Sequence, residues 1–190
     1  GTTGSQPWEP KNYDGTFEGP MPLKRGLAKS KNMISIRVLQ AISPPFAQEW
    51  ATRFGFEAEK HPAYLTMALG AGSTTPLQMA SAYGVFASGG YLVAPRLIER
   101  LTDSQGRVLL QAAPPRLDDS MRTLDARNAF VMTSMLQGVM QHGTGAAALS
   151  LKWPLAGKTG TVDDYTDAWF IGFDPNITVG VWLGHDEKKP

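Results

Sequence analysis

Three runs of strand-forming residues near the end of the chain constrain its fold more than any other feature. The first run, 155–162, reads Leu-Ala-Gly-Lys-Thr-Gly-Thr-Val, and two more follow at 168–173 and 178–183. The last two runs are rich in aromatic and β-branched residues, and the turn between them, 174–176, reads Asp-Pro-Asn, which is typical of tightly connected strands. We therefore predict a three-stranded antiparallel meander with 155–162 at its edge.

Helical spacing dominates the residues before these strands. The predicted helices follow Pro22, contain Ile34 to Ile42, run from about Phe46 to Phe54, start at Pro76 after a Thr75 cap, and run from about Asp125 to Gln141. Leu97–Thr102 and Val108–Gln111 predict a small hairpin. Helices packed on an antiparallel sheet make an α/β fold of the α+β type. The predicted organisation is a lead-in at 1–20, a mainly helical part at 22–150 and strands at 154–184.

The lead-in at 1–20 is rich in glycine, proline and aromatic residues and has no periodicity. Such a composition predicts an irregular segment. We expect its aromatic side chains, Trp8, Tyr13 and Phe17, to hold it against the rest of the protein by packing.

Composition excludes several classes of function. The 190 residues are 42% hydrophobic, enough for a sizeable core in one or two domains. Eighteen basic and seventeen acidic residues give a net charge of +1, which offers no reason to expect nucleic acid as a partner. The chain has no cysteine, and its three histidines lack metal-ligand spacing. No signal peptide and no apolar run of the roughly 20 residues that span a bilayer is visible, so an export signal or anchor is expected outside the chain.

The edge strand carries Lys158-Thr159-Gly160 at its middle. In an extended chain Lys158 and Gly160 share one face, where the lysine offers a cation and the glycine lets another backbone approach. Thr159 and Thr161 add hydroxyl groups. This combination fits the carboxylate of an acyl-D-amino acid. A plain structural interpretation stands beside it, because lysine protects sheet edges against aggregation and threonine favours strands.

Two short motifs carry a resemblance to a known family. Ser30-Lys31-Asn32 and, much later, Lys158-Thr159-Gly160-Thr161 resemble the second and third signature motifs of penicillin-binding proteins and serine β-lactamases. Four further segments resemble the transpeptidase domain of bifunctional class A enzymes of the penicillin-binding protein 1A type: 8–13, 69–80, 143–145 and 167–170. The resemblance covers nearly the whole chain, and it implies a partial β-lactamase/transpeptidase-like fold.

The resemblance implies a peptidoglycan D,D-transpeptidase that cross-links stem peptides through a serine acyl-enzyme and is acylated by β-lactams. Three catalytic residues follow from it. Ser30 would relay a proton to the leaving nitrogen, Asn32 would bind the acyl side chain and the general-base lysine, and Lys158 would keep Ser30 poised.

The same resemblance implies three substrate-binding residues. Thr159 would bind the substrate carboxylate, Gly160 would leave room beside the strand, and the Thr161 N–H would form half of the oxyanion hole, where fixed donors are needed. No cofactor and no metal is implied. The implied partners are stem peptides ending in D-Ala-D-Ala and β-lactams, and nucleic acid is not among them.

One family motif is missing. Ser-x-x-Lys, which supplies the nucleophilic serine and its lysine base, occurs nowhere in the chain, and Ser150-Leu151-Lys152 has the wrong spacing. We expect the chain to be the C-terminal portion of the transpeptidase domain, inactive alone and completed by an N-terminal part. The parent would also carry a glycosyltransferase domain and a membrane anchor, at the periplasmic face of the bacterial inner membrane.

Other interpretations stay open at this point. The chain could be a non-catalytic module that binds peptide or cell-wall components, or a hydrolase that uses Ser30 with Lys31. For single residues, Ser30 could simply cap the helix that contains Ile34, and Asn32 could be a turn residue.

Overall fold

The computed structural model describes residues 7–162, 165–187 and 189. Its α-helices are α1 (Leu23–Ala28), α2 (Asn32–Ile42), α3 (Pro44–Thr52), α4 (Pro76–Ala87) and α5 (Ala126–His142). Short 3₁₀ helices are η1 (Ala58–Lys60), η2 (Leu65–Leu69), η3 (Asp119–Met121) and η4 (Ala146–Leu151). The strands are β1 (Arg100–Thr102), β2 (Val108–Gln111), β3 (Ala156–Thr161), β4 (Asp167–Phe173) and β5 (Thr178–Gly184).

The C-terminal strands form the predicted antiparallel sheet. Their order is β3-β4-β5, so β3 is an edge strand, as expected. In the register, Lys158 lies opposite Ile171 and Thr161 lies opposite Ala168. The predicted α+β class, with helices on an antiparallel sheet, is confirmed.

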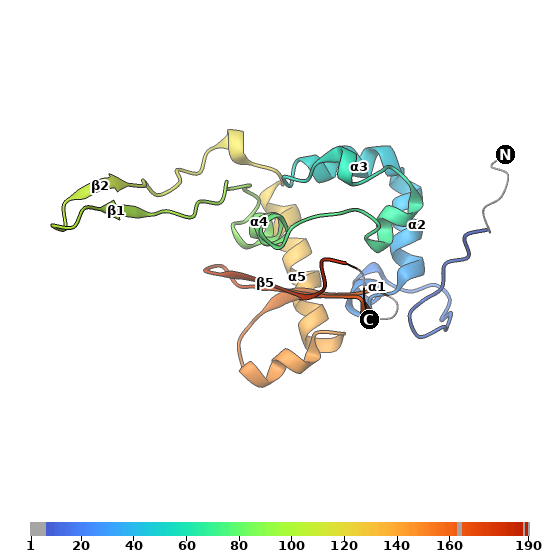
Figure 1. Cartoon of the computed structure of the whole chain (residues 1–190). Coiled ribbons are helices and arrows are strands. Elements are labelled where there is room, and N and C mark those ends of the chain that lie inside the picture. The colour runs from blue at the N-terminus through green and yellow to red at the C-terminus, as the bar shows by residue number, and fades with distance from the viewer. Residues whose placement is uncertain (1–6, 163–164, 188, 190) are drawn as a thin grey trace.

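One face of this sheet carries the helices. α5 lies along β3 and α4 along β5 (Figure 1). Leu136 of α5 packs with Ala156 and Phe173 of the sheet, and each of these three side chains is almost fully buried. Aromatic and aliphatic side chains of α1 and α4 complete this core: Leu27, Tyr83, Phe86 and Ala87. Since alternate residues of a strand point to opposite faces, Lys158 shares the helix-covered face with Ala156.

The opposite face of the sheet is exposed along β5. Three outward-facing side chains of β5 are about half exposed, Val179 at 46%, Val181 at 45% and Leu183 at 68%. Burial alternates along this strand, as it does where one face of a sheet packs on a core. The helices therefore leave this face open along β5, whereas Gly157 on the same face of β3 is buried.

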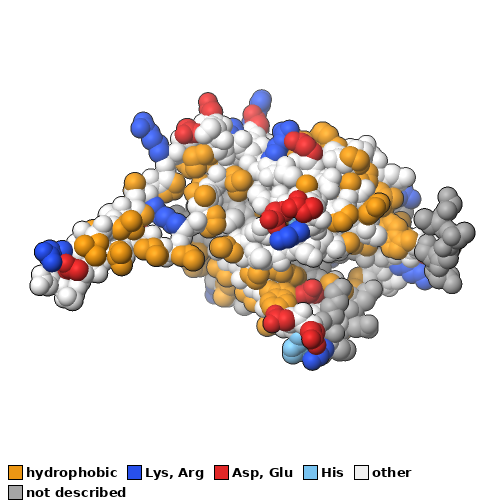
Figure 2. All heavy atoms as spheres, turned by 45° about the horizontal axis from the view of Figure 1, so that its top comes forward, with side chains coloured by type: hydrophobic (Ala, Val, Ile, Leu, Met, Phe, Trp, Pro, Cys, Tyr) orange, Lys and Arg blue, Asp and Glu red, His pale blue; other side chains and the backbone are white. Residues whose placement is uncertain are grey.

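The β1–β2 hairpin is an arm that extends away from the rest of the molecule (Figure 1). Its register contains a bulge at Leu101/Thr102. Apolar side chains are exposed along it, among them Leu109 and Leu110 (Figure 2). The hairpin was predicted from Leu97, but β1 starts at Arg100, and Leu97 is 91% exposed.

Helix α3 begins two residues before the predicted start. Ser43 takes a positive φ of 75° and its side chain accepts a hydrogen bond from Phe46 N–H, so Pro44 and Pro45 occupy the first turn. Proline has no N–H to lose there and its fixed φ suits the helix. The two prolines therefore belong to α3, which starts at Pro44 and not at about Phe46.

The lead-in is irregular where it is described, but it is not held in the expected way. Residues 7–22 contain no helix or strand. Trp8, Tyr13 and Phe17 are 46%, 64% and 65% exposed, so the predicted aromatic packing was wrong. The buried residues here are polar, namely Asn12 of the lead-in and Lys31, which lies against it. Hydrogen bonds and an ion pair take the place of apolar contacts.

Candidate active site

Ser30 lies where α1 ends, in a conformation that glycine usually adopts. Its φ is +53°, in the left-handed region. The Ser30 N–H donates to Leu27 O at 3.0 Å and the Lys31 N–H donates to Gly26 O at 2.9 Å. These two bonds form a Schellman motif with Ser30 at the left-handed position. A non-glycine residue there costs on the order of 1 kcal/mol or more, and such strain is typical of functional sites.

Lys158 contacts Ser30, which is far from it in the sequence. The Lys158 Nζ donates to Ser30 Oγ at 2.8 Å, although 128 positions separate the two residues, and it also donates to Thr159 O at 2.9 Å. No carboxylate pairs with Lys158 among the described residues. Burial lowers the pKa of the Lys158 ammonium because the charged form loses hydration. The site therefore contains a cation without a carboxylate partner.

Thr159 points to the other side of β3, toward a residue that the sequence reasoning did not assign to the site. Its hydroxyl lies 2.6 Å from the hydroxyl of Thr144. Thr144 also donates its N–H to Ala28 O at 3.1 Å, and so joins the end of α1 to β3. The Gly-Thr-Gly segment, 143–145, was noted as part of the resemblance, and its polar centre could have been assigned from that signal.

Gly160 and Thr161 complete β3. A Cβ added at Gly160 would lie 3.4 Å from Trp169 Cβ, and beyond its chain neighbours no other described atom lies within 4 Å of it. Thr161 is exposed. The next residue, Val162, donates its N–H to Asp167 O on β4 at 3.1 Å. Successive N–H groups of an antiparallel strand point to opposite edges, which directs the Thr161 N–H to the free edge.

Asn32 is the first residue of α2, and the structure does not join it to Lys158. Its Nδ2 donates to Lys11 O at 2.9 Å. Within the described residues it makes no hydrogen bond to the Ser30 or Lys158 side chain. The segments 30–32 and 158–161 are nevertheless adjacent, because Ser30, two residues before Asn32, contacts Lys158.

Two of the open interpretations are contradicted. Ser30 does not cap α2: the N-cap is Lys31, without a side-chain hydrogen bond, and Asn12 Oδ1 accepts from Met33 N–H instead. Lys31 does not serve Ser30 either, because its Nζ lies 2.6 Å from Asp14 Oδ2. A hydrolase built on Ser30 with Lys31 therefore has no basis in the geometry.

Two tyrosines join the lead-in to the segment after β3. The hydroxyls of Tyr13 and Tyr165 lie 2.7 Å apart. Both rings are mostly exposed, at 64% and 71%. Their contact has no signal in the sequence, since 152 positions separate the two residues.

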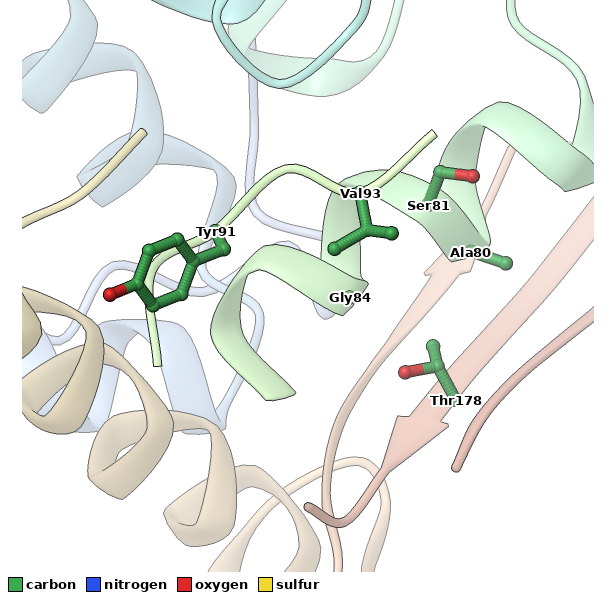
Figure 3. Close-up of a pocket in the computed structure, with 6 residues that line it drawn as sticks. All are labelled: Ala80, Ser81, Gly84, Tyr91, Val93 and Thr178. Atoms are coloured by element: carbon green, nitrogen blue, oxygen red, sulfur yellow. The ribbon is translucent and has the colours of Figure 1, made fainter. Parts of the chain in front are cut away.

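A pocket of about 260 Å³ lies elsewhere, between α4 and the start of β5 (Figure 3). As far as the chain is described, its lining includes none of the predicted site residues: Ala80, Ser81, Gly84, Tyr91, Val93 and Thr178. The described residues also hold no group of three or more histidine or acidic side chains placed to bind a metal ion. None of the described helices is both long and apolar enough to cross a membrane.

Comparison with known proteins agrees with the two motifs. The family described as "Penicillin binding protein transpeptidase domain" matches residues 1–188. The chain belongs to this family. Penicillin-binding protein 1A of Neisseria flavescens is 45% identical over 184 residues, which are 96% of this chain and 23% of that protein. The chain thus spans about a quarter of the length of this curated relative.

Solved structures of the penicillin-binding protein family share the fold. Penicillin-binding protein 1A from Haemophilus influenzae matches with a TM-score of 0.90 and 32% identity, over 100% of this chain and 34% of that one. Penicillin-binding protein A from Mycobacterium tuberculosis, solved as an imipenem acyl-enzyme complex, matches with a TM-score of 0.73 over 91% of this chain and 45% of that one. At 21% identity, the second likeness concerns the fold alone.

Proposed function

We propose that this chain is the C-terminal portion of the transpeptidase domain of a class A penicillin-binding protein. The parent cross-links peptidoglycan stem peptides through a serine acyl-enzyme and is acylated by β-lactams. The observation that carries the proposal is the 2.8 Å contact between Lys158 Nζ and Ser30 Oγ. We also propose that the parent carries a glycosyltransferase domain and a membrane anchor outside this chain. The parent would act at the periplasmic face of the bacterial inner membrane.

The contact between Lys158 and Ser30 suits a proton relay. The Lys158 ammonium donates to the Ser30 oxygen, so the hydroxyl proton of Ser30 is directed away from Lys158. That proton can pass to the nitrogen that leaves when the D-Ala-D-Ala bond or a β-lactam ring opens. Burial lowers the pKa of the Lys158 ammonium, so Lys158 can more readily return a proton to Ser30 Oγ after each transfer.

The charge of the site suits an anionic substrate. Lys158 has no carboxylate partner among the described residues, so a substrate carboxylate would meet an uncompensated cation. Thr159 would exchange its present hydroxyl contact with Thr144 for one to this carboxylate, and Gly160 would let the substrate backbone lie close to β3. The Thr161 N–H at the free edge would stabilise the oxyanion of the tetrahedral intermediate.

Asn32 would bind the acyl side chain and the general-base lysine. To do so, its amide would exchange the present hydrogen bond to Lys11 O for one to the substrate. Its place at the start of α2, two residues from Ser30, is compatible with that role.

The nucleophile would come from a segment outside this chain, since Ser-x-x-Lys is absent from it. The uncovered sheet face formed by Val179, Val181 and Leu183 offers a packing surface for such a segment. We propose that the N-terminal part of the same domain covers this face, and that the 190-residue chain alone is inactive.

Labelling of the full-length protein with a fluorescent penicillin tests the proposal. We expect Lys158→Met to lower the acylation rate by about 10²–10³, the effect of removing one fixed donor in other acyl-transfer enzymes. Lys60→Met is the matched control, because Lys60 is a surface lysine paired with Glu57. Acylation of Lys158→Met at the wild-type rate would refute the assigned role.

The isolated chain separates catalysis from simple binding. It should show no covalent label until the N-terminal part of the domain is added. Saturable, reversible binding of a D-Ala-D-Ala peptide, weakened by Lys158→Ala, together with no label in the completed domain, would favour the non-catalytic module instead.

A further inference from the structure

The lead-in is tied to the residues around Ser30 by an ion pair between a buried lysine and a half-exposed carboxylate. Lys31 is only 5% exposed, and its Nζ lies 2.6 Å from Asp14 Oδ2 and 3.8 Å from Glu18 Oε1. The hydrogen bond from Lys31 is the main cause that lowers the pKa of Asp14 to about 2. The carboxylate is therefore charged at neutral pH.

A second polar contact joins the same segments. Asn12 is 7% exposed, and its Oδ1 accepts a hydrogen bond from Met33 N–H at 3.1 Å. Its Nδ2 donates to Thr16 O at 2.6 Å, which fixes the loop that presents Asp14. Asn12 thereby satisfies one of the N–H groups that the first turn of a helix leaves unpaired. The lead-in supplies from a distance the cap that α2 lacks locally.

Both contacts hold residues that closely follow a strained residue. Ser30, at φ +53°, is followed directly by Lys31, whose N–H closes the Schellman motif on Gly26 O. If Lys31 moves, the motif opens and Ser30 can relax toward a common right-handed or extended conformation. Its Oγ would then leave the 2.8 Å contact with Lys158.

We infer that Lys31 and Asp14 are positioning residues, which hold Ser30 in its left-handed conformation and so keep its hydroxyl on Lys158. This inference rests on the proposed function. Neither side chain needs to touch the substrate, because the ion pair acts through the backbone of Ser30. A buried ammonium without its carboxylate is costly, so the pair couples the lead-in to the site tightly.

The test measures acylation of the full-length protein by a fluorescent penicillin over a range of concentrations, which separates the acylation rate constant from the preceding reversible affinity. We expect Lys31→Met to lower the rate constant by about tenfold to a hundredfold, as displacements near 1 Å do in active sites. The reversible affinity should change by less than about threefold, since the pair makes no substrate contact. A role in folding alone would not produce this split.

Two further variants separate positioning from folding. Lys31→Arg keeps a cation for Asp14 and Glu18 and should recover most of the lost rate. The double variant Lys31→Met with Asp14→Asn leaves no unpaired charge from this pair, so it should be acylated no more slowly than Lys31→Met alone, because coupled residues are not additive. Arg107→Met is the matched control: it breaks an exposed ion pair with Asp103 on the distant arm and should leave the rate unchanged.

The outcomes distinguish this inference from the proposed function. If the wild-type protein is labelled and Lys31→Met is labelled equally fast, the positioning role is refuted and the proposed function stands. Equal losses in Lys31→Met and Lys31→Arg, or independent losses that add in the double variant, also refute it. A wild-type protein that takes no label removes the proposed function and the inference together.

Discussion

The turn that contains Gly143 offers a sharp test of how the site is assembled. A Cβ added at Gly143 would lie 1.8 Å from Ala28 O and 2.6 Å from Ala28 C, both backbone atoms at the end of α1. Because real Cβ contacts are essentially never shorter than 3.0 Å, Gly143→Ala has to move α1 and the turn apart by about 1.2 Å. Ala28 lies two residues before Ser30, and the next residue of the turn, Thr144, contacts Thr159. Both halves of the site are therefore displaced relative to each other.

The magnitude follows from that displacement. Overpacking of this kind costs typically 1–3 kcal/mol of stability, and a shift of about 1 Å in an active site can lower the rate about 10²-fold. We expect Gly143→Ala in the full-length protein to lower the thermal midpoint and to reduce acylation by a fluorescent penicillin about 10²-fold.

Gly84→Ala is the matched control for this substitution. Nothing lies within 4 Å of a Cβ at Gly84, inside α4. Alanine is the better helix former there, by about 1 kcal/mol, so this variant should be as stable as wild type or more so, with unchanged acylation. If Gly143→Ala matches Gly84→Ala in both measurements, the contact between the turn and α1 does not set the geometry of the site.

Three further outcomes are expected. Burial raises the pKa of Tyr83 to about 12, so the unfolded tyrosine ionises first and stability falls between about pH 10 and 12; urea titrations should show a fall larger in wild type than in Tyr83→Phe by at most about 2–3 kcal/mol. Thr75→Ala removes the capping box with Gln78 at the start of α4 and should lower the unfolding free energy by about 1 kcal/mol, whereas an unchanged value would show that the cap is redundant. Thr144→Val removes the hydroxyl contact with Thr159 and should slow acylation while leaving the thermal midpoint within about 2 °C, and an equal rate would place Thr144 outside the site.

The strands were predictable because their signals are local. β3 to β5 follow from strand-forming residues and a tight turn, and the register then places Lys158 on the helix-covered face. The helices followed from caps and apolar spacing in the same way. The start of α3 was predicted two residues late because proline interrupts a helix interior but also begins helices, and the positive φ of Ser43 places Pro44 in the first turn.

The site was predictable only in part because its decisive features are not local. Serine gives no sign that it will take a left-handed conformation, so Ser30 was considered as a cap for α2. The lead-in was expected to be held by aromatic packing, since Asn12, Asp14 and Lys31 look like ordinary surface residues until the chain brings them together. A buried lysine is rare unless it is paired, and sequence spacing does not reveal a partner 17 positions away.

Two unfavourable local features coincide at one contact. Glycine would occupy the left-handed end of α1 without strain, but glycine has no hydroxyl with which to meet Lys158. Lys158 in turn is placed where burial disfavours its charge and no described carboxylate compensates it. Neither feature improves the stability of the fold, and each is needed only for the 2.8 Å contact between them. Since strained and desolvated groups persist where the surroundings hold them in place, we expect the Lys31–Asp14 ion pair beside Ser30 to keep this contact in place.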